Sequence, residues 1–174
     1  QQQLWRMRLI ERVVKAEKLT SESFGPFGDV LGPQIREPTL STDIFRYWGS
    51  AAQLRMADVE AGYLVVKYRP FTFGKMERHL KTTEMFIPME GCSLFPVAAP
   101  STLDHAEAAP ASHEVRAFIM DGSAAVLLKE GVWHWAPFPL TATSSYLVLH
   151  RKGTVDIDLD MQDLEKALTF RLTL

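Results

Sequence analysis

Residues 75–91 read Lys-Met-Glu-Arg-His-Leu-Lys-Thr-Thr-Glu-Met-Phe-Ile-Pro-Met-Glu-Gly, two short strand-like runs separated by a polar turn. Because side chains alternate along a strand, Glu77 and His79 point to one face and Arg78 to the other. A neighbouring strand that begins at Glu84 adds a second carboxylate beside that face. Nitrogen and oxygen ligands placed in this way suit a divalent metal ion, so the stretch predicts a chelate on a β-sheet. We expect Arg78 to face away from the chelate and Arg78→Ala to leave activity largely intact.

The same stretch also has a plainer interpretation. Glu77 and His79 can be solvated side chains on an outer strand face, with Glu84 serving only as the first residue of the next strand. The spacing of these three residues does not by itself separate the two interpretations.

The rest of the chain consists of short runs rich in β-branched and aromatic residues, separated by clusters of Gly, Pro, Ser or Asp, which is typical of an all-β sandwich or barrel. The predicted strands are Ile10–Ala16, Ile44–Trp48, Gly62–Tyr68, Lys75–Leu80, Glu84–Pro88, Cys92–Ala98, Val115–Ile119, Ala124–Leu128, Ser144–His150 and Thr154–Leu159. So many strands in one domain need a closed or double sheet, because one open sheet would expose long edges. We therefore expect a barrel.

Two short helices are predicted on the outside of this barrel. One is a turn at Ser21–Phe24, and the other spans Asp160–Leu168, where apolar residues recur at helical spacing and Asp160 can cap the first turn. The Ala-rich stretch Ala99–His113 has Pro and Ser near its ends and little pattern, so it is predicted to be a surface loop and a candidate lid.

Composition narrows the classes of protein that the chain can belong to. Its 174 residues, 47% hydrophobic and 23% charged, suit one domain spanning residues 1–174. A net charge of −2 without a basic block argues against nucleic acid as a partner. The apolar runs fall short of the roughly 18 residues that a membrane span needs. With Cys92 as the single cysteine, we expect a reducing, cytoplasmic location and a metal held by His and carboxylates.

A second stretch that can carry chemistry is Lys129–Trp135, where a glycine turn at Gly131 precedes His134, which lies between two tryptophans. Taken alone, His134 can be a packed core residue with a ring nitrogen bonded to the backbone. Its occurrence together with the first stretch suggests instead a shared site.

Together the two stretches resemble the paired motifs of the cupin superfamily. His79, Glu84 and Gly91 match the second histidine, the glutamate and the closing glycine of the first motif, and His134 follows its glycine as in the second motif. The resemblance implies a cupin-like β-barrel, a double-stranded β-helix, with a few short peripheral helices. It also implies a metal ion held by Glu77, His79, Glu84 and His134, with Glu77 replacing the usual first histidine.

A closer resemblance is to the ureidoglycolate lyase family. The matching stretches are Phe27-Gly28-Asp29-Val30, Arg46-Tyr47, Glu77-Arg78-His79, Phe86-Ile87-Pro88-Met89-Glu90-Gly91, Arg116-Ala117-Phe118-Ile119 and Val132-Trp133-His134. This resemblance implies cleavage of ureidoglycolate to glyoxylate and urea in allantoin breakdown, with no ammonia released. It further implies a divalent ion such as nickel, a homodimer, and a small carboxylate as the substrate.

The substrate carries a carboxylate, an α-hydroxyl and a ureido group on one carbon. An ion chelated by the carboxylate and the hydroxyl would lower the hydroxyl pKa, and one of the two site carboxylates, if not coordinated, would act as base. Candidates for binding the substrate are Arg46, Tyr47, Arg116 and Lys129. Each of the three cations can equally be a surface charge whose ion pair contributes little.

The chain also departs from the enzymes that it resembles. Leu127 and Leu128 stand where those enzymes carry polar residues, and with Trp133 they predict an apolar wall facing the ureido group. These leucines keep an alternative open, a cupin barrel, catalytic or not, that binds or transforms a different small carboxylic acid. A third alternative is another metal-dependent cupin reaction, such as isomerisation or oxygenation.

Overall fold

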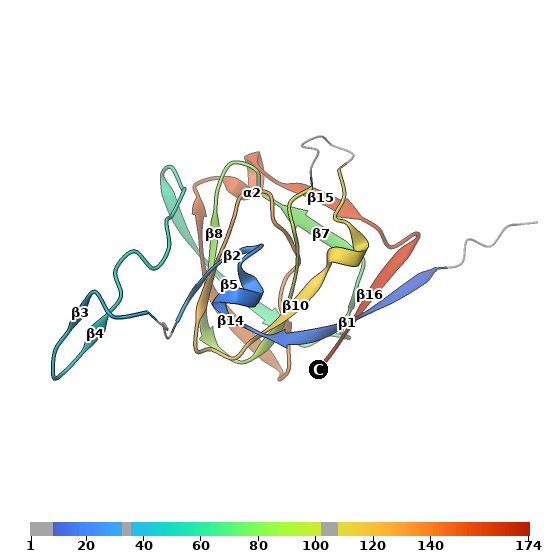
Figure 1. The fold of residues 1–174 in the computed structure, drawn as a ribbon. Helices are drawn as coiled ribbons and strands as arrows, with labels where there is room; N and C mark the ends of the chain where they lie inside the picture. The colour runs from blue at the N-terminus through green and yellow to red at the C-terminus, as the bar shows by residue number, and fades with distance from the viewer. Residues whose placement is uncertain (1–8, 33–35, 102–107) are drawn as a thin grey trace, which may run out of the picture.

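Two facing β-sheets form the barrel of the computed structural model, which describes residues 9–32, 36–101 and 108–174 (Figure 1). The larger sheet contains, in spatial order, β15 (Asp160–Asp163), β7 (Lys75–Arg78), β12 (Trp133–His134), β9 (Ser93–Ala98), β10 (Arg116–Met120), β1 (Ile10–Lys18), β16 (Leu168–Thr173) and β6 (Thr72–Phe73), with β13 (Phe138–Pro139) also paired to β9. The smaller sheet contains β2 (Gly28–Leu31), β11 (Ala125–Leu128), β8 (Glu84–Glu90), β14 (Thr143–Arg151) and β5 (Val59–Lys67).

The strand order is that of a jelly roll. The central part of the larger sheet runs β7-β12-β9-β10, and the smaller sheet runs β11-β8-β14-β5. Strands that are distant in the chain are therefore neighbours within each sheet, while most strands that follow each other in the chain lie in opposite sheets. This interleaved pattern of eight strands is the one on which cupin barrels are built. The predicted all-β, cupin-like double-stranded β-helix is thus confirmed.

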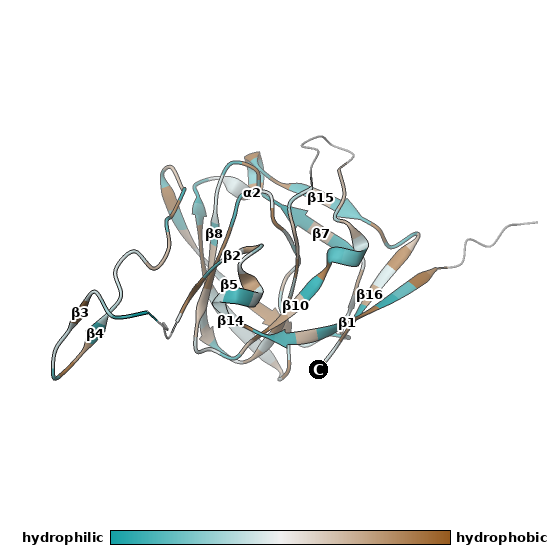
Figure 2. Cartoon of the chain, viewed as in Figure 1, coloured by the Kyte–Doolittle hydropathy of each residue, from teal (hydrophilic) through white to brown (hydrophobic). Residues whose placement is uncertain are grey.

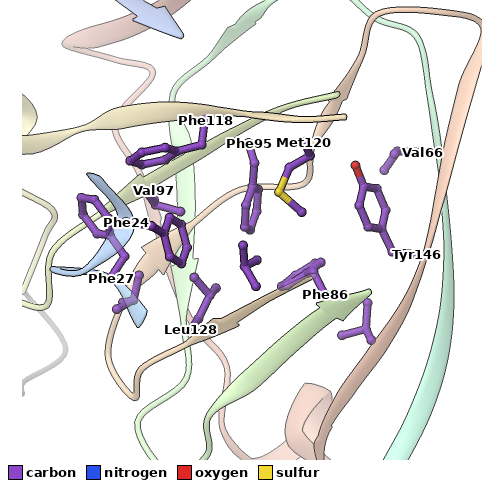
Figure 3. Packing of buried hydrophobic residues seen from close by; sticks show 13 residues of the cluster. Phe24, Phe27, Val66, Phe86, Phe95, Val97, Phe118, Met120, Leu128 and Tyr146 are labelled. Atoms are coloured by element: carbon purple, nitrogen blue, oxygen red, sulfur yellow. The ribbon is translucent and has the colours of Figure 1, made fainter. Parts of the chain in front are cut away.

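The barrel is filled by aromatic side chains from both sheets (Figure 3). The rings of Phe24 and Phe118 meet edge to face with centroids 5.1 Å apart, and those of Phe86 and Phe95 lie 4.9 Å apart. Offset and edge-to-face contacts of this kind add to the free energy gained by burying the rings. His134 lies 6.0 Å from the ring of Phe86, so the core supports the residues at the end of the barrel.

A second cluster of buried residues lies on the other face of the larger sheet. Ala117 belongs to this second cluster, whereas Phe118 and Met120 belong to the cluster between the sheets. Figure 2 shows hydrophobic residues interspersed with more hydrophilic ones along β16. Its buried residues Phe170 and Leu172 are two positions apart, so one face of this strand packs into the second cluster.

Several strands differ from the sequence prediction. The predicted strand Ile44–Trp48 is reduced to β4 (Arg46–Tyr47), which pairs with β3 (Leu40–Ser41) in a hairpin that stands away from the barrel (Figure 1). Strand β2 was missed because it begins at a glycine. A Cβ on Gly28 would lie 1.8 Å from the carbonyl oxygen of Leu127, so β2 can pair closely with β11 only if this residue has no side chain.

The C-terminal part of the chain was predicted wrongly. Thr154–Leu159 is not a strand: α2 (Thr154–Ile157) starts directly after Gly153, whose φ of 77° turns the chain. Asp160–Leu168 is not a helix, because Asp160 starts β15, which pairs with β7, and its carboxylate accepts from Arg78 instead of capping a helix. Long-range strand pairing outweighs the local helical spacing here.

The other short helices lie at the periphery. The prediction of α1 (Ser21–Phe24) is confirmed, with the Thr20 hydroxyl accepting from the backbone N–H of Ser23 at 3.0 Å. A 3-10 turn (Ser112–Glu114) ends the predicted loop, whose residues 102–107, where a lid was expected, lie outside the described residues. Within the described ranges, none of the helices has the length and apolar character needed to cross a bilayer.

Arg78 confirms the alternation along β7, because it packs on the face opposite to Glu77. Its guanidinium lies 4.6 Å from the ring centroid of Trp133 and donates from Nε to Asp160 at 2.7 Å. The side chain is fully buried, so alanine at this position is expected to lower stability, while the expectation that activity stays largely intact remains a prediction. Removing the side chain would leave a cavity beside Trp133 and an acid without its partner.

We expect Arg78→Ala to lower the free energy of unfolding by about 3 kcal/mol, measured by urea denaturation, without weakening metal binding at the folded site. Lys75→Ala, on the same strand, serves as the control and should change stability little. A folded Arg78→Ala protein that binds metal as poorly as His79→Ala would contradict the assignment of faces.

Candidate active site

Four side chains predicted from the sequence converge at one end of the barrel. The Nε2 atom of His79 lies 3.3 Å from Oε2 of Glu84, and that of His134 lies 3.1 Å from Oε1 of the same carboxylate. Glu77 approaches His134 Nε2 at 3.6 Å. The structure therefore brings together all the predicted metal ligands, and the interpretation of Glu77 and His79 as solvated outer-face residues is not favoured.

Strands of both sheets position these four residues. Glu77 lies on β7 and pairs with His134 of β12, so their side chains are on the same face of the larger sheet. His79 directly follows β7, and Glu84 starts β8 of the smaller sheet. The polar turn between β7 and β8 thus brings Glu77 and His79, from the side of the larger sheet, close to Glu84 of the smaller sheet.

A pocket of about 240 Å³ opens onto this cluster. Its lining residues are Gly62, Tyr63, Leu64, Glu77, Glu84, Phe86, His134, Ala136, Val148 and Val155. Drug-sized ligands occupy pockets of about 300–1,000 Å³, so this pocket suits a smaller molecule. Two carboxylates and an imidazole provide its charge, and no lysine or arginine is among its lining residues in the described ranges.

Backbone carbonyl groups fix the orientation of both site histidines. Nδ1 of His79 lies 2.7 Å from the carbonyl oxygen of Asp158, and Nδ1 of His134 lies 3.1 Å from that of Val132. A carbonyl oxygen only accepts hydrogen bonds, so each Nδ1 carries a proton and donates it. Each Nε2 atom is then directed at Glu84. Histidines that bind metal ions usually donate the N–H of their other ring nitrogen in this way.

The atoms that face one another here are suited to a cation. Glu84 Oε1 and His134 Nε2 are buried and without a hydrogen-bond partner in the described part of the chain, although they lie only 3.1 Å apart. Two lone pairs at this distance repel each other, whereas a proton or a metal ion between them is attracted to both. Bonds of about 2.1 Å to a divalent ion place neighbouring donor atoms roughly 3.0–3.4 Å apart, close to the separations observed.

A second set of three possible metal ligands also lies close together. One ligand atom each of Glu77, His79 and His134 lies within 4.8 Å of the other two. The two imidazoles and two carboxylates therefore fit a divalent metal ion. Several such ions accept nitrogen and oxygen ligands.

One residue of the cluster, His150, was not predicted from the sequence. Its Nδ1 lies 2.9 Å from Glu84 Oε2, and its Nε2 lies 3.1 Å from Oε1 of Glu60. His150 stands at the end of a predicted strand, two residues after Val148, which lines the pocket. The alternation along β14 places both on one face, and that was the signal that could have identified His150.

The charged groups of the cluster shift one another's pKa values. Burial raises the pKa of Glu84, but contacts with the three imidazoles of His134, His150 and His79 outweigh it and hold that pKa well below its usual value. Burial likewise opposes the charged form of His79, yet the contact with Glu84 raises its pKa to about 9. The contact with Glu84 is also the main reason why the pKa of His150 is raised. Without a metal ion, His79 is thus protonated at neutral pH.

This shift predicts competition between protons and metal ions. Because the pKa of His79 is raised to about 9, each ion bound below that pH must displace one proton from the ring. We expect the apparent Kd for Ni²⁺ to fall up to about tenfold per unit rise between about pH 7 and pH 8.5, in a competition titration with a buffered chelator. An unshifted imidazole, with a pKa near 6.5, would leave the Kd almost constant over this range. A constant Kd would therefore contradict the assignment.

The four residues predicted to bind substrate lie elsewhere. Arg46 and Tyr47 are exposed on the β3–β4 hairpin, away from the barrel. Arg116 forms a two-pronged ion pair with Glu17 at 2.7 and 2.8 Å, and Lys129 donates to the carbonyl of Gly25. None of the four lines the pocket, so their contact with a substrate stays a prediction.

The prediction of which residues form an apolar wall is wrong. Trp133 lies on the face of β12 opposite to His134 and donates from its indole nitrogen to Ser101. Leu127 and Leu128 both line a separate pocket, and Leu128 also packs in the core between the sheets. Apolar side chains do face the cluster, but they belong to β5, β8 and β14.

Comparisons with known proteins identify the family of the chain. A family model described as ureidoglycolate lyase matches residues 11–171. The chain is 32% identical over 144 residues to the ureidoglycolate lyase of Pseudomonas savastanoi pv. phaseolicola (strain 1448A / Race 6), and 31% identical over 149 residues to that of Pseudomonas syringae pv. syringae (strain B728a). Each alignment covers 79% of this chain and 82% of the relative.

A solved structure of RmlC from Streptococcus suis overlaps with 53% of this chain and 43% of its own, at a TM-score of 0.35 and 10% identity. That overlap is too weak to add to the fold, which the strand order already establishes. The family of the chain is shown by the match of the family model over nearly the whole chain and by the two relatives. The chain belongs to the ureidoglycolate lyase family.

Proposed function

We propose that this protein cleaves ureidoglycolate to glyoxylate and urea at the pocket above Glu77, His79, Glu84 and His134. The observation that carries the proposal is the convergence of two imidazoles and two carboxylates in a member of this family. Two of their facing atoms have no hydrogen-bond partner among the described residues. A homodimer, a cytoplasmic location and a place in allantoin breakdown stay predictions.

Cleavage by elimination moves one proton and breaks one bond. The α-hydroxyl loses its proton, its oxygen forms the carbonyl of glyoxylate, and the bond from the same carbon to the ureido nitrogen breaks. The electron pair of that bond stays on nitrogen, which takes up a proton to give urea. The site must therefore remove a proton from oxygen and provide one to a nitrogen attached to the same carbon.

His79, Glu84 and His134 would hold the divalent ion, with Ni²⁺ as the ion that the family resemblance implies. Glu84 fits a ligand role better than Glu77, because its buried carboxylate lies between both Nε2 atoms while the Glu77 side chain is 29% exposed. An ion bound there supplies the positive charge that a carboxylate and a developing alkoxide require. This charge is needed because the described lining contains no basic side chain other than imidazole.

Glu77 is the carboxylate that remains for proton transfer. It lines the pocket, is partly open to it, and contacts the cluster only at 3.6 Å from His134. Its carboxylate accepts the proton of the α-hydroxyl. Because the oxygen and the nitrogen are bonded to the same carbon, the resulting carboxylic acid can return the proton to the departing nitrogen with little movement.

The remaining pocket wall favours elimination over hydrolysis. Leu64, Phe86 and Val148 line the pocket beside the cluster and offer no group that could hold a water molecule against the ureido carbonyl. Hydrolysis at that carbonyl would release ammonia, whereas elimination releases intact urea.

Product analysis tests this proposal. The protein loaded with Ni²⁺ should form glyoxylate and urea from ureidoglycolate in a one-to-one ratio, with ammonia detected only after urease is added. Ammonia formed before urease is added would contradict the elimination. A folded protein with metal bound that forms neither product would overturn the substrate assignment.

A further inference from the structure

The feature that the proposed reaction leaves unused is the buried histidine behind the site. His150 is 7% exposed and does not line the pocket, yet its ring joins two carboxylates that come from different strands. Glu84 starts β8, whereas Glu60 lies on β5 and is partly exposed. The three residues form a continuous line from the site to the surface.

We propose that His150, anchored by Glu60, is a positioning residue that fixes the carboxylate of Glu84 so that its Oε1 atom faces the metal site. This inference deepens the proposed function and rests on it for the role of Glu84. His150 does not line the pocket, and of the site residues that its ring contacts, Glu84 is the one to which it is hydrogen-bonded, so its effect is assigned to Glu84.

The hydrogen bonds of the ring allow one orientation. Carboxylate oxygens accept hydrogen bonds, so Nδ1 of His150 donates to Glu84 and Nε2 donates to Glu60. The oxygen of Glu60 also accepts from the backbone N–H of Gly153 at 3.3 Å, which holds it in place. A ring held at both nitrogens cannot flip without breaking a charged hydrogen bond at each end.

Glu84 is oriented by the same contacts. Its Oε2 atom is bonded to His150 at 2.9 Å, while Oε1 has no hydrogen-bond partner among the described residues and lies 3.1 Å from His134 Nε2. Without His150, Oε2 would lose its short contact, and the carboxylate could rotate about its last bond. Rotation moves Oε1 away from the position at which an ion would be bound.

The backbone around His150 is tied to the turn that carries Glu84. The N–H of Arg151 donates to the hydroxyl of Thr82 at 3.0 Å, and the hydroxyl of Thr154 donates to the carbonyl of Arg151 at 2.6 Å. The end of β14 is thus attached to the segment between β7 and β8. A positioning group must be held by rigid elements of this kind to orient a ligand.

The test measures Ni²⁺ affinity of the metal-free protein by competition with a chromophoric chelator, without any assay of turnover. His150→Ala should raise the Kd about 10- to 100-fold. His150→Asn should stay within about threefold of wild type, because the asparagine amide nitrogen occupies the place of Nδ1 and can still donate to Glu84. Circular dichroism and thermal unfolding establish that each variant is folded.

Two controls separate positioning from general stability. Ser144→Ala, also on β14, removes the buried 2.6 Å hydrogen bond to Ser93 and should leave the Kd unchanged. In a Glu84→Ala background, where the Kd is already raised, His150→Ala should cause no further loss, because its effect passes through Glu84.

Three results would overturn the inference. These are a wild-type Kd in folded His150→Ala, an equal loss for His150→Ala with and without Glu84, and a wild-type protein that binds no Ni²⁺. Separate outcomes bear on the proposed function. A His150 effect on Ni²⁺ affinity without urea formation would contradict the reaction alone, whereas urea formation with no His150 effect would contradict this inference alone.

Discussion

His134→Ala is expected to lower kcat/KM for ureidoglycolate by on the order of 10³-fold and to weaken Ni²⁺ binding by about 100-fold or more. The ring provides an Nε2 atom that is 3.1 Å from Glu84, 3.6 Å from Glu77 and without a hydrogen-bond partner among the described residues. Its removal takes away one metal ligand and leaves the buried carboxylate of Glu84 with one imidazole fewer. The value of kcat/KM and the affinity for Ni²⁺ should therefore fall together.

His113→Ala is the matched control for His134→Ala, because His113 is an exposed histidine in the 3-10 turn and does not line the pocket. It should behave as wild type in both assays. Steady-state kinetics and chelator competition on the folded proteins check this pair. Wild-type activity in a folded His134→Ala protein would contradict the location of the site.

Glu77→Gln is expected to separate the two functions of the cluster. The substitution keeps the shape of the side chain but removes its ability to accept a proton, so kcat should fall by about 10²- to 10³-fold. Because Glu77 is assigned to proton transfer and Glu84 to the metal ion, the Kd for Ni²⁺ should stay within about threefold of wild type.

The control for this variant is Glu90→Gln, at the exposed end of β8, which should change neither kcat nor the Kd. Single-turnover kinetics at saturating substrate would show that the loss is in the chemical step. If Glu77→Gln instead abolishes Ni²⁺ binding, Glu77 is a metal ligand, and the base must be sought elsewhere.

The part of the site that the sequence could predict is the part that depends on strand alternation. Glu77 and His79 are two residues apart at the end of one strand, so their shared face follows from the backbone alone. Glu84 follows after a short turn, and His134 was added by its resemblance to a second motif. For these residues, the faces predicted from the strand pattern are the ones that the folded sheets bring together.

Residues whose role depends on a distant partner are not assigned a partner by the local pattern. His150 is separated from Glu84 by 66 positions and from Glu60 by 90, and the pairing of β14 with β8 and β5 brings them together. Asp160 was predicted to cap a helix, but it lies beside Arg78, 82 positions away, across β15 and β7. In both cases the sheet pairing, not the local pattern, decides the contact.

The substrate-binding residues show a different limit. Arg116 was proposed because its stretch resembles the family, but a matching stretch does not tell which contacts its side chain makes. In the structure its guanidinium lies 5.2 Å from the ring centroid of Phe118 and pairs with Glu17. The substrate needs a positive charge, and the described lining of the pocket does not take it from this arginine.

The most direct test of the account is a titration of the metal-free protein with Ni²⁺ while glyoxylate formation is followed. The account predicts no turnover in the presence of a chelator and a linear rise in rate that ends at one ion per chain. The same end point should be absent in His134→Ala. Full activity of the thoroughly metal-free protein, or a rate that does not respond to the ion while one ion binds per chain, would contradict the claim that ureidoglycolate is cleaved at a metal site formed by these residues.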